Sequence, residues 1–321
     1  MSDQPRTLYG GQAVIEGVMI RGRTRAAVSV RRPSGTIARH ALPLSSWANS
    51  SARRIPFIRG VLVLLETLTI GMKSLTISAQ EAAGEDDGKE AELSAASMGL
   101  MLVVSILLAV GIFFLIPLFA SRWAESAGAG PFLANVFEGA LRLFLFIAYI
   151  WLIGRMKDIQ RVFGYHGAEH MAVAAHEAGQ PLTVKTVRRF PKAHPRCGTS
   201  FLMTVVVVSI ILFVLIPREP FWFLFGSRLV LIPVIAAISY EFIRYAGTHS
   251  NLLWVRILGA PNLMLQELTT REPDDQMIEV AIDAMNYAIA LDTGKVLPGD
   301  VSPGGAANPM RPAEADLTEE R

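Results

Sequence analysis

The stretch Ala96–Ala120, ASMGLMLVVSILLAVGIFFLIPLFA, decides the fold class of this chain. Its 25 residues carry no charge, and a helix needs about 20 apolar residues to cross the hydrocarbon core of a bilayer. Because lipid offers the backbone no hydrogen bonds, a single spanning segment of this kind is stable there only as a helix. We therefore predict a transmembrane helix here and an α-helical integral membrane protein overall.

Three further apolar segments follow this stretch, and we interpret each as a transmembrane helix: Val136–Gly154, Ser200–Pro217 and Arg228–Tyr245. The first of the three contains Glu138 and Arg142, which lie one helical turn apart and can form an ion pair. The composition agrees, because the 321-residue chain is 51% hydrophobic and only 18% charged, with a mean hydropathy of +0.38. The sequence therefore predicts a four-helix membrane domain over residues 96–245.

The distribution of positive charge orients these helices. Residues 155–199 contain eight Lys and Arg side chains, whereas the loop between the first two helices contains Arg122 and the last hairpin contains Arg218. The positive-inside rule then puts both termini and the 155–199 loop in the cytoplasm of a multi-pass protein of the plasma (inner) membrane. The net charge of +2 is too small to indicate nucleic acid as a partner. The single cysteine, Cys197, excludes an internal disulfide and suits a reducing compartment.

The regions that flank the membrane domain have simpler signatures. Residues 1–56 form a cytoplasmic β region, in which AAVSVRR and TIARHAL flank a Pro33-Ser34-Gly35 turn typical of a hairpin. Residues 57–81 are apolar but interrupted by charges, which favours a helix lying on the membrane or re-entering it. Residues 82–95 are an acidic linker.

Beyond the membrane domain, residues 246–291 are expected to form a cytoplasmic helical region. It ends in an amphipathic helix that starts at Thr270–Pro273 and has an apolar face at helical spacing, formed by Met277, Val280, Ala281, Ala284, Met285 and Ala288. Residues 292–321 are rich in Pro, Gly, Ala and Glu, which predicts a disordered tail.

The chemistry of the chain is concentrated in GYHGAEH, residues 164–170. His166-Gly-Ala-Glu169-His170 has the form H-x-x-E-H, the inverted zinc-hydrolase motif. Residues four apart lie on one face of a helix, so both imidazoles can bind one ion. Glu169 then lies beside the ion, where a general base for water belongs. We predict a bound divalent transition metal, and zinc suits these ligands best.

The remaining ligands are open at this point. His194 and Cys197 form an H-x-x-C pair, and together with His166 and His170 they would make a closed, structural site. Glu241, near the cytoplasmic end of the last apolar segment, would instead leave one position open for catalysis. Its alternative is an ion pair with Arg244 one turn further on.

A glycine-rich segment near the N-terminus, YGGQAVIEGVMIRG, admits two interpretations. Its glycines permit a close approach of the backbone to another group. It is either a tight β-turn, or it lines the site with Gln12 and Glu16.

The order of these motifs supplies a resemblance. YGGQAVIEGVMIRG, PFIRGVLVLLETLTIGMKSL, RVFGYHGAEH, HPRCGTSF, ISYEF and LQELTTREPDD resemble the YqhQ-like family of uncharacterised bacterial membrane proteins over residues 8–290, apart from the acidic linker. The resemblance implies a membrane protein described as a predicted metal-dependent enzyme, and it implies no substrate.

Two functions therefore follow as expectations. The first is a membrane-embedded, metal-dependent hydrolase open to the cytoplasm, which acts on a membrane peptide or a lipid-linked amide or ester. The second is a scaffold or assembly factor in which zinc only staples the cytoplasmic loop. The lipid bilayer is a partner in both.

Overall fold

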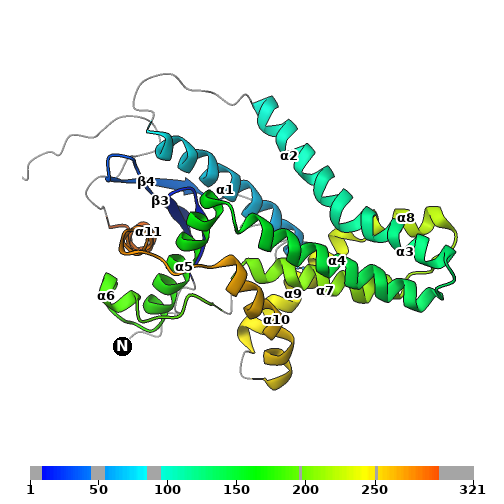
Figure 1. Cartoon of the computed structure of the whole chain (residues 1–321). Coiled ribbons are helices and arrows are strands. Elements are labelled where there is room, and N and C mark those ends of the chain that lie inside the picture. The colour runs from blue at the N-terminus through cyan, green and yellow to red at the C-terminus, as the bar shows by residue number, and fades with distance from the viewer. Residues whose placement is uncertain (1–8, 45–54, 85–94, 195–196, 250–251, 296–321) are drawn as a thin grey trace, which may run out of the picture.

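The computed structural model describes residues 9–44, 55–84, 95–194, 197–249 and 252–295. The protein is mostly helical, with one small sheet near the N-terminus. Long apolar helices lie on one side of the molecule, and the sheet with its covering helices lies on the other (Figure 1).

Four strands form an antiparallel meander in chain order: β1 (Gly10–Val14), β2 (Gly17–Arg21), β3 (Arg25–Arg31) and β4 (Ile37–Pro43). The hairpin predicted around Pro33-Ser34-Gly35 is confirmed, since Arg31 pairs with Ile37 and Gly35 takes a φ of +85°. The glycine-rich segment forms the first hairpin, in which Val14 pairs with Gly17.

Helices cover both faces of this sheet because its side chains alternate. Val18 and Ile20 of β2 pack in one hydrophobic cluster with α5 (Lys157–Glu177) and α11 (Asp275–Thr293). Met19, between them, points to the opposite face and packs with Ile70 of α1 (Ile58–Ala83). The short helix α6 (Val184–Val187) follows α5. The sheet thus lies between α1 and the pair α5 and α11.

The predicted apolar face of α11 is confirmed. All six residues of that face are buried: Met277, Val280, Ala281, Ala284, Met285 and Ala288. Its start was predicted too early. Asp274 is the N-cap, and its carboxylate accepts from the Met277 backbone N–H at 2.8 Å. Residues 270–273 are not helical, in part because the residue before Pro273 is disfavoured in a helix.

Three helices are long and apolar enough to cross a membrane: α1, the run Gly99–Ser126 and α4 (Pro131–Ile153). The second consists of α2 (Ala95–Val110), a π-helical turn η3 (Gly111–Leu115) and α3 (Ile116–Ser126). A fourth candidate exists if α8 (Phe221–Val230) and α9 (Ile232–Thr248), bent by 45° at their junction, form one span. The described residues therefore contain three or four candidate spans.

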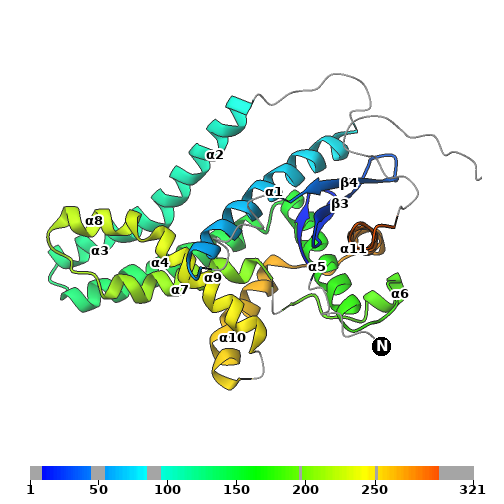
Figure 2. The same cartoon turned by 180° about the vertical axis from the view of Figure 1, so that it is seen from behind.

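Two segments differ from the predicted topology. Helix α7 (Thr199–Val214), expected to be a span, has 16 residues, a length of about 24 Å against the roughly 30 Å of hydrocarbon core. Helix α1 satisfies the criteria for a span by composition, yet its C-terminal half covers the sheet while its N-terminal half contacts α9 (Figure 2).

Helix α10 (Leu253–Thr269) is apolar and contains Pro261. Most of the acidic linker and of the tail lies outside the described residues.

A buried ionic cluster joins the apolar helices. The predicted pair is present, because Arg142 donates to Glu138 at 2.9 Å. Arg228 and Arg218 also donate to this carboxylate, at 3.0 and 3.3 Å. Arg142 further donates from Nε to the carbonyl of Phe113 inside the π-helical turn, at 2.9 Å. Since a buried charge is stable only when it is paired, these bonds fix α4 against α8 and η3.

Candidate metal centre

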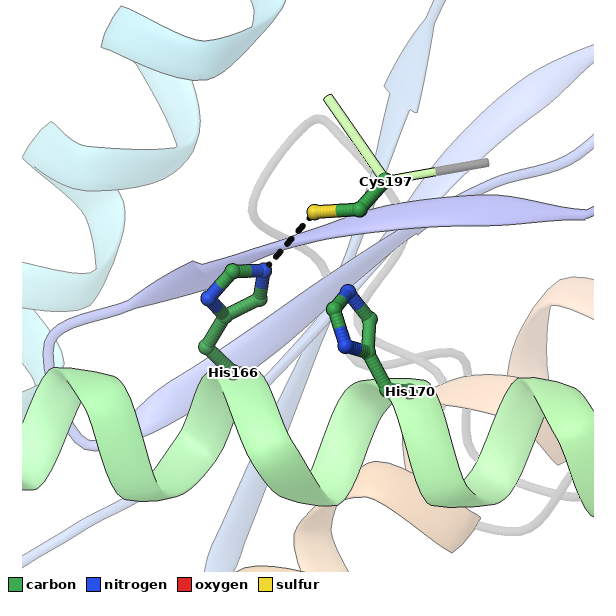
Figure 3. Close-up of side chains that lie close together, drawn as sticks. All are labelled: His166, His170 and Cys197. Atoms are coloured by element: carbon green, nitrogen blue, oxygen red, sulfur yellow. Dashed lines mark hydrogen bonds between the residues drawn. The ribbon is translucent and has the colours of Figure 1, made fainter. Parts of the chain in front are cut away.

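Three buried side chains meet where α5 passes the start of α7. His166 and His170 lie one turn apart on α5, with ring centroids separated by 4.4 Å. Cys197, two residues before α7, points at them, and its Sγ lies 3.1 Å from His166 Nε2 (Figure 3). One ligand atom from each residue can be chosen so that all lie within 4.8 Å of one another. This spacing is compatible with a shared metal ion after a small adjustment of the side chains.

Backbone carbonyls fix the tautomer of both histidines. His166 Nδ1 lies 2.8 Å from the Thr269 carbonyl oxygen, and His170 Nδ1 lies 2.6 Å from that of Lys192. A carbonyl only accepts, so each Nδ1 carries the hydrogen and each Nε2 keeps a lone pair. His170 Nε2 is buried and has no hydrogen-bond partner in the described part of the chain. The contact between Nδ1 and a backbone carbonyl is the usual way in which proteins orient an imidazole that binds a metal through Nε2.

Glu169 lies beside this group but outside it. Its Oε2 is 3.6 Å from His170 Nε2, yet no carboxylate oxygen joins the set of ligand atoms found among the described residues. Burial raises the pKa of Glu169 to about 7, against the opposing electrostatic effect of His166 and a hydrogen bond from the Gly11 backbone. A carboxylate with this pKa is suited to accept and return a proton near neutral pH.

The N-terminal sheet closes the site from the other side. A Cβ on Gly11 would lie 2.8 Å from Glu169 Cγ and 2.6 Å from the Met19 carbonyl oxygen, so only glycine fits without a shift. Gly167 has a comparable role, because its Cβ would lie 2.4 Å from the Arg271 carbonyl oxygen. These close approaches let β1 and the segment after α10 contact the helix that carries both histidines.

A cavity of about 410 Å³ opens beside Glu169, His170 and Cys197. Its other wall comes from the first hairpin and includes Gln12, as one interpretation of the glycine-rich segment expected. Glu16 is elsewhere: it accepts from Arg161 and, at 3.2 Å, from the Tyr165 hydroxyl.

The structure does not bring His194 or Glu241 into the ligand group. His194 lines the cavity, but its Nε2 lies 3.3 Å from a carboxylate oxygen of Glu177. Glu241 accepts from Arg59 Nε at 2.6 Å and from the Phe57 backbone. Neither the closed set with His194 nor the open set with Glu241 is therefore assembled, and Cys197 is the third ligand candidate. For Glu241 the reason is a long-range ion pair with Arg59, which spacing along the sequence does not reveal.

Two residues near the end of α10, which the sequence analysis did not single out, support the site. The Gln266 side-chain amide accepts from the His194 backbone N–H at 2.8 Å and donates to the His194 carbonyl at 2.9 Å. The Thr269 carbonyl holds His166. The signal that could have found them was the run LQELTTREPDD, one of the motifs that carried the family resemblance.

Comparison with known proteins identifies the family. Residues 55–291, which include every element of the site except the first hairpin, match the family described as "Protein of unknown function (DUF1385)". The chain belongs to the DUF1385 family. "Uncharacterized protein YqhQ" of Bacillus subtilis (strain 168) is 32% identical over 295 residues, which cover 88% of this chain and 93% of YqhQ. No solved structure matches the chain. The predicted family is thus confirmed, and membership of DUF1385 carries no activity with it.

Proposed function

We propose that this DUF1385 protein is a metal-dependent hydrolase of the plasma membrane, with both termini and its site on the cytoplasmic side. One observation carries the proposal. Two backbone carbonyls hold both imidazoles with their Nε2 lone pairs toward a buried thiol, and one of these nitrogens has no hydrogen-bond partner among the residues that the structure describes. Burying an unsatisfied nitrogen is costly, and a metal ion would satisfy it.

The donor set favours zinc. Two imidazoles and a thiolate suit Zn²⁺, and three protein ligands with a cavity beside them are typical of catalytic rather than structural zinc sites. When bound, the ion would supply Lewis acidity and lower the pKa of a coordinated water to about 7.

Glu169 provides the proton transfer. Hydrolysis of an ester or amide joins the water oxygen to the acyl carbon and breaks the bond from that carbon to oxygen or nitrogen. Glu169 takes a proton from the water and returns it to the leaving oxygen or nitrogen. Gly11 orients the carboxylate through its backbone. The substrate class remains the one expected, a membrane peptide or a lipid-linked amide or ester.

Elemental analysis of the purified full-length protein tests the metal. We expect about one zinc ion per chain, and its loss in His166→Ala, His170→Ala and Cys197→Ser. Glu169→Gln should retain the metal, because Glu169 is not a ligand, and His249→Ala serves as a control histidine outside the site. Metal content unchanged in the His166→Ala, His170→Ala double variant would remove the proposal.

Complementation of a deletion strain separates enzyme from scaffold. General-base catalysis is worth about 10²- to 10⁴-fold, so Glu169→Gln should fail to complement although it folds and binds metal. Full complementation by this variant would leave the zinc-stapled scaffold as the function.

A further inference from the structure

A second cavity, of about 530 Å³, lies between α9 and α10. We call it the apolar pocket. Its lining includes Ser200 of α7, Phe242 and Ala246 of α9, and Leu253, Arg256 and Ile257 of α10. Both α9 and α10 pack against α7, and Ser200 in the first turn of α7 is buried. This turn therefore closes the inner end of the apolar pocket.

The mouth of the apolar pocket is itself apolar. Leu253 and Ile257 line the pocket and are nevertheless 71% and 61% exposed, so they lie where it opens. They are four residues apart on α10 and share one face of that helix. Trp254 and Leu258, which follow them in the sequence, are also exposed and extend the apolar surface. A chain of methylene groups gains free energy on leaving water for such a cavity, whereas a polar ligand would lose its hydration.

The polar side chains inside the apolar pocket are already bonded to protein groups. Ser200 Oγ accepts from the Gln266 amide at 3.1 Å, and the same amide donates to the His194 carbonyl at 2.9 Å. Asn262, which also lines the pocket, donates from Nδ2 to Thr204 Oγ1 at 3.4 Å. The interior therefore suits the apolar part of a ligand, and a polar head group belongs at the mouth.

One cation lines the apolar pocket. Arg256 is the only charged side chain among the described residues of the lining. It is exposed, and its guanidinium has no hydrogen bond or ion pair within the described part of the chain. A guanidinium binds a carboxylate through two parallel, charge-assisted hydrogen bonds. An apolar interior with this cation in its lining complements an apolar chain that ends in a carboxylate.

We propose that the apolar pocket binds one long-chain fatty acid, with the chain between α9 and α10 and the carboxylate on Arg256. A cavity of about 530 Å³ is of the size that holds one drug-sized molecule, roughly 300–1,000 Å³. This size favours a single acyl chain over the two chains of a phospholipid. The proposal goes beyond the hydrolase and needs no metal ion.

Binding to the full-length protein in neutral detergent tests the site, with oleic acid, oleyl alcohol and phosphatidylglycerol as probes. Native mass spectrometry counts the bound molecules and follows their competition. We expect one oleate per chain at pH 8. Oleyl alcohol, which has the same chain and no charge, should bind roughly tenfold more weakly, as expected for the loss of a charge-assisted hydrogen bond. Phosphatidylglycerol should not displace oleate.

Two variants test the two parts of the apolar pocket. Arg256→Gln should bind oleate no better than oleyl alcohol. Its control is Arg155→Gln, which removes an arginine that lies over Trp151 at the end of α4, outside the lining. Gly259→Leu adds a side chain to the lining where a Cβ meets nothing within 4 Å. It should fold normally and lose oleate binding, because the added side chain occupies the cavity.

Gly226→Leu is the matched control for Gly259→Leu. Gly226 is also a helical glycine whose Cβ would meet nothing within 4 Å, and it lies on α8 outside the lining. Equal binding of oleyl alcohol and oleate, displacement by phosphatidylglycerol, equal effects of Arg256→Gln and Arg155→Gln, or normal binding by Gly259→Leu would overturn the proposal.

A metal measurement separates this site from the hydrolase. His166→Ala should bind oleate as the wild type does, and Gly259→Leu should keep its zinc. If oleate binding follows the prediction while the wild type contains no metal, the fatty-acid site stands and the hydrolase fails.

Discussion

Glu169 depends on the absence of a side chain at Gly11. The carboxylate is fully buried, and its neighbours on α5 are two imidazoles that are neutral when they bind a metal. The nearest backbone donor comes from β1, some 160 positions away in the chain. Sequence spacing along α5 predicts that Glu169 stands beside the ligands, but it cannot reveal that the hairpin reaches over to hold it.

Gly11→Ala is expected to destabilise the protein, because the added methyl group would press on Glu169 and on the Met19 carbonyl. Overpacking of this kind typically costs about 1–3 kcal/mol, so the unfolding temperature should fall by several degrees. Gly10→Ala is the matched control, since a Cβ there meets nothing within 4 Å. Equal unfolding temperatures for the two variants would contradict the packing described.

At the scale of elements, the sequence was most informative where periodicity is strong. The strands of the β3–β4 hairpin were predicted to within one residue and the buried face of α11 residue by residue, because alternation and helical spacing are local signals. Helix α1 shows the opposite case: its hydropathy suits a membrane, but its role follows from the sheet that it covers. The partner of Glu241 was missed for the same reason, since Arg59 lies 182 positions away.

The β1–β2 turn provides a pH prediction. Hydrogen bonds from Arg161 lower the pKa of Glu16, in spite of partial burial, and they join this turn to α5. A lowered folded pKa means that the unfolded chain takes up the proton more readily. The pair therefore stabilises the fold above about pH 4.5, and the contribution is lost as pH falls through the folded pKa.

Glu16→Gln should accordingly lower the unfolding temperature at pH 7, and its effect should shrink as the pH falls below about 4.5. The effect should be no more than about 1 kcal/mol, because the Arg161 side chain is 51% exposed and solvent screens the pair. The control is Arg188→Gln. This variant removes the ion pair between Arg188 and Asp275, which is more exposed than the pair between Arg161 and Glu16. A difference between wild type and Glu16→Gln that does not change with pH would contradict this account.

At the scale of the whole molecule, the exposed apolar surface is compatible with a bilayer. An 18-residue window within Gly99–Ser126 has no buried residue, and in Figure 1 the N-terminal part of α2 stands away from the other described elements. On α4, the exposed Phe132 and Trp151 lie about 28 Å apart along the axis, close to the roughly 30 Å of a hydrocarbon core. These are the positions expected of aromatic side chains at the two interfaces.

Cysteine labelling tests the orientation. With a cysteine at position 126, an impermeant maleimide should label intact cells, because the few positive charges in the hairpin after α3 predict that it faces outward. A cysteine at position 180 should react only after permeabilisation. Both positions are exposed, and the native Cys197 is buried, which keeps the background low. Labelling at position 180 in intact cells would reverse the topology.

The π-helical turn in the first apolar run determines where this protein can tolerate a change in length. A π turn accommodates one more residue than an α turn while the helices on either side keep their facing. Loss of a single codon within Gly111–Leu115 would restore a regular helix and leave Ser121 toward Arg218, from which it accepts at 2.9 Å. The same loss within α3, before Ser121, would rotate that hydroxyl by about 100°. The carbonyl of Phe113 that accepts from Arg142 lies in this turn, and single-residue deletions in this span should be confined to it.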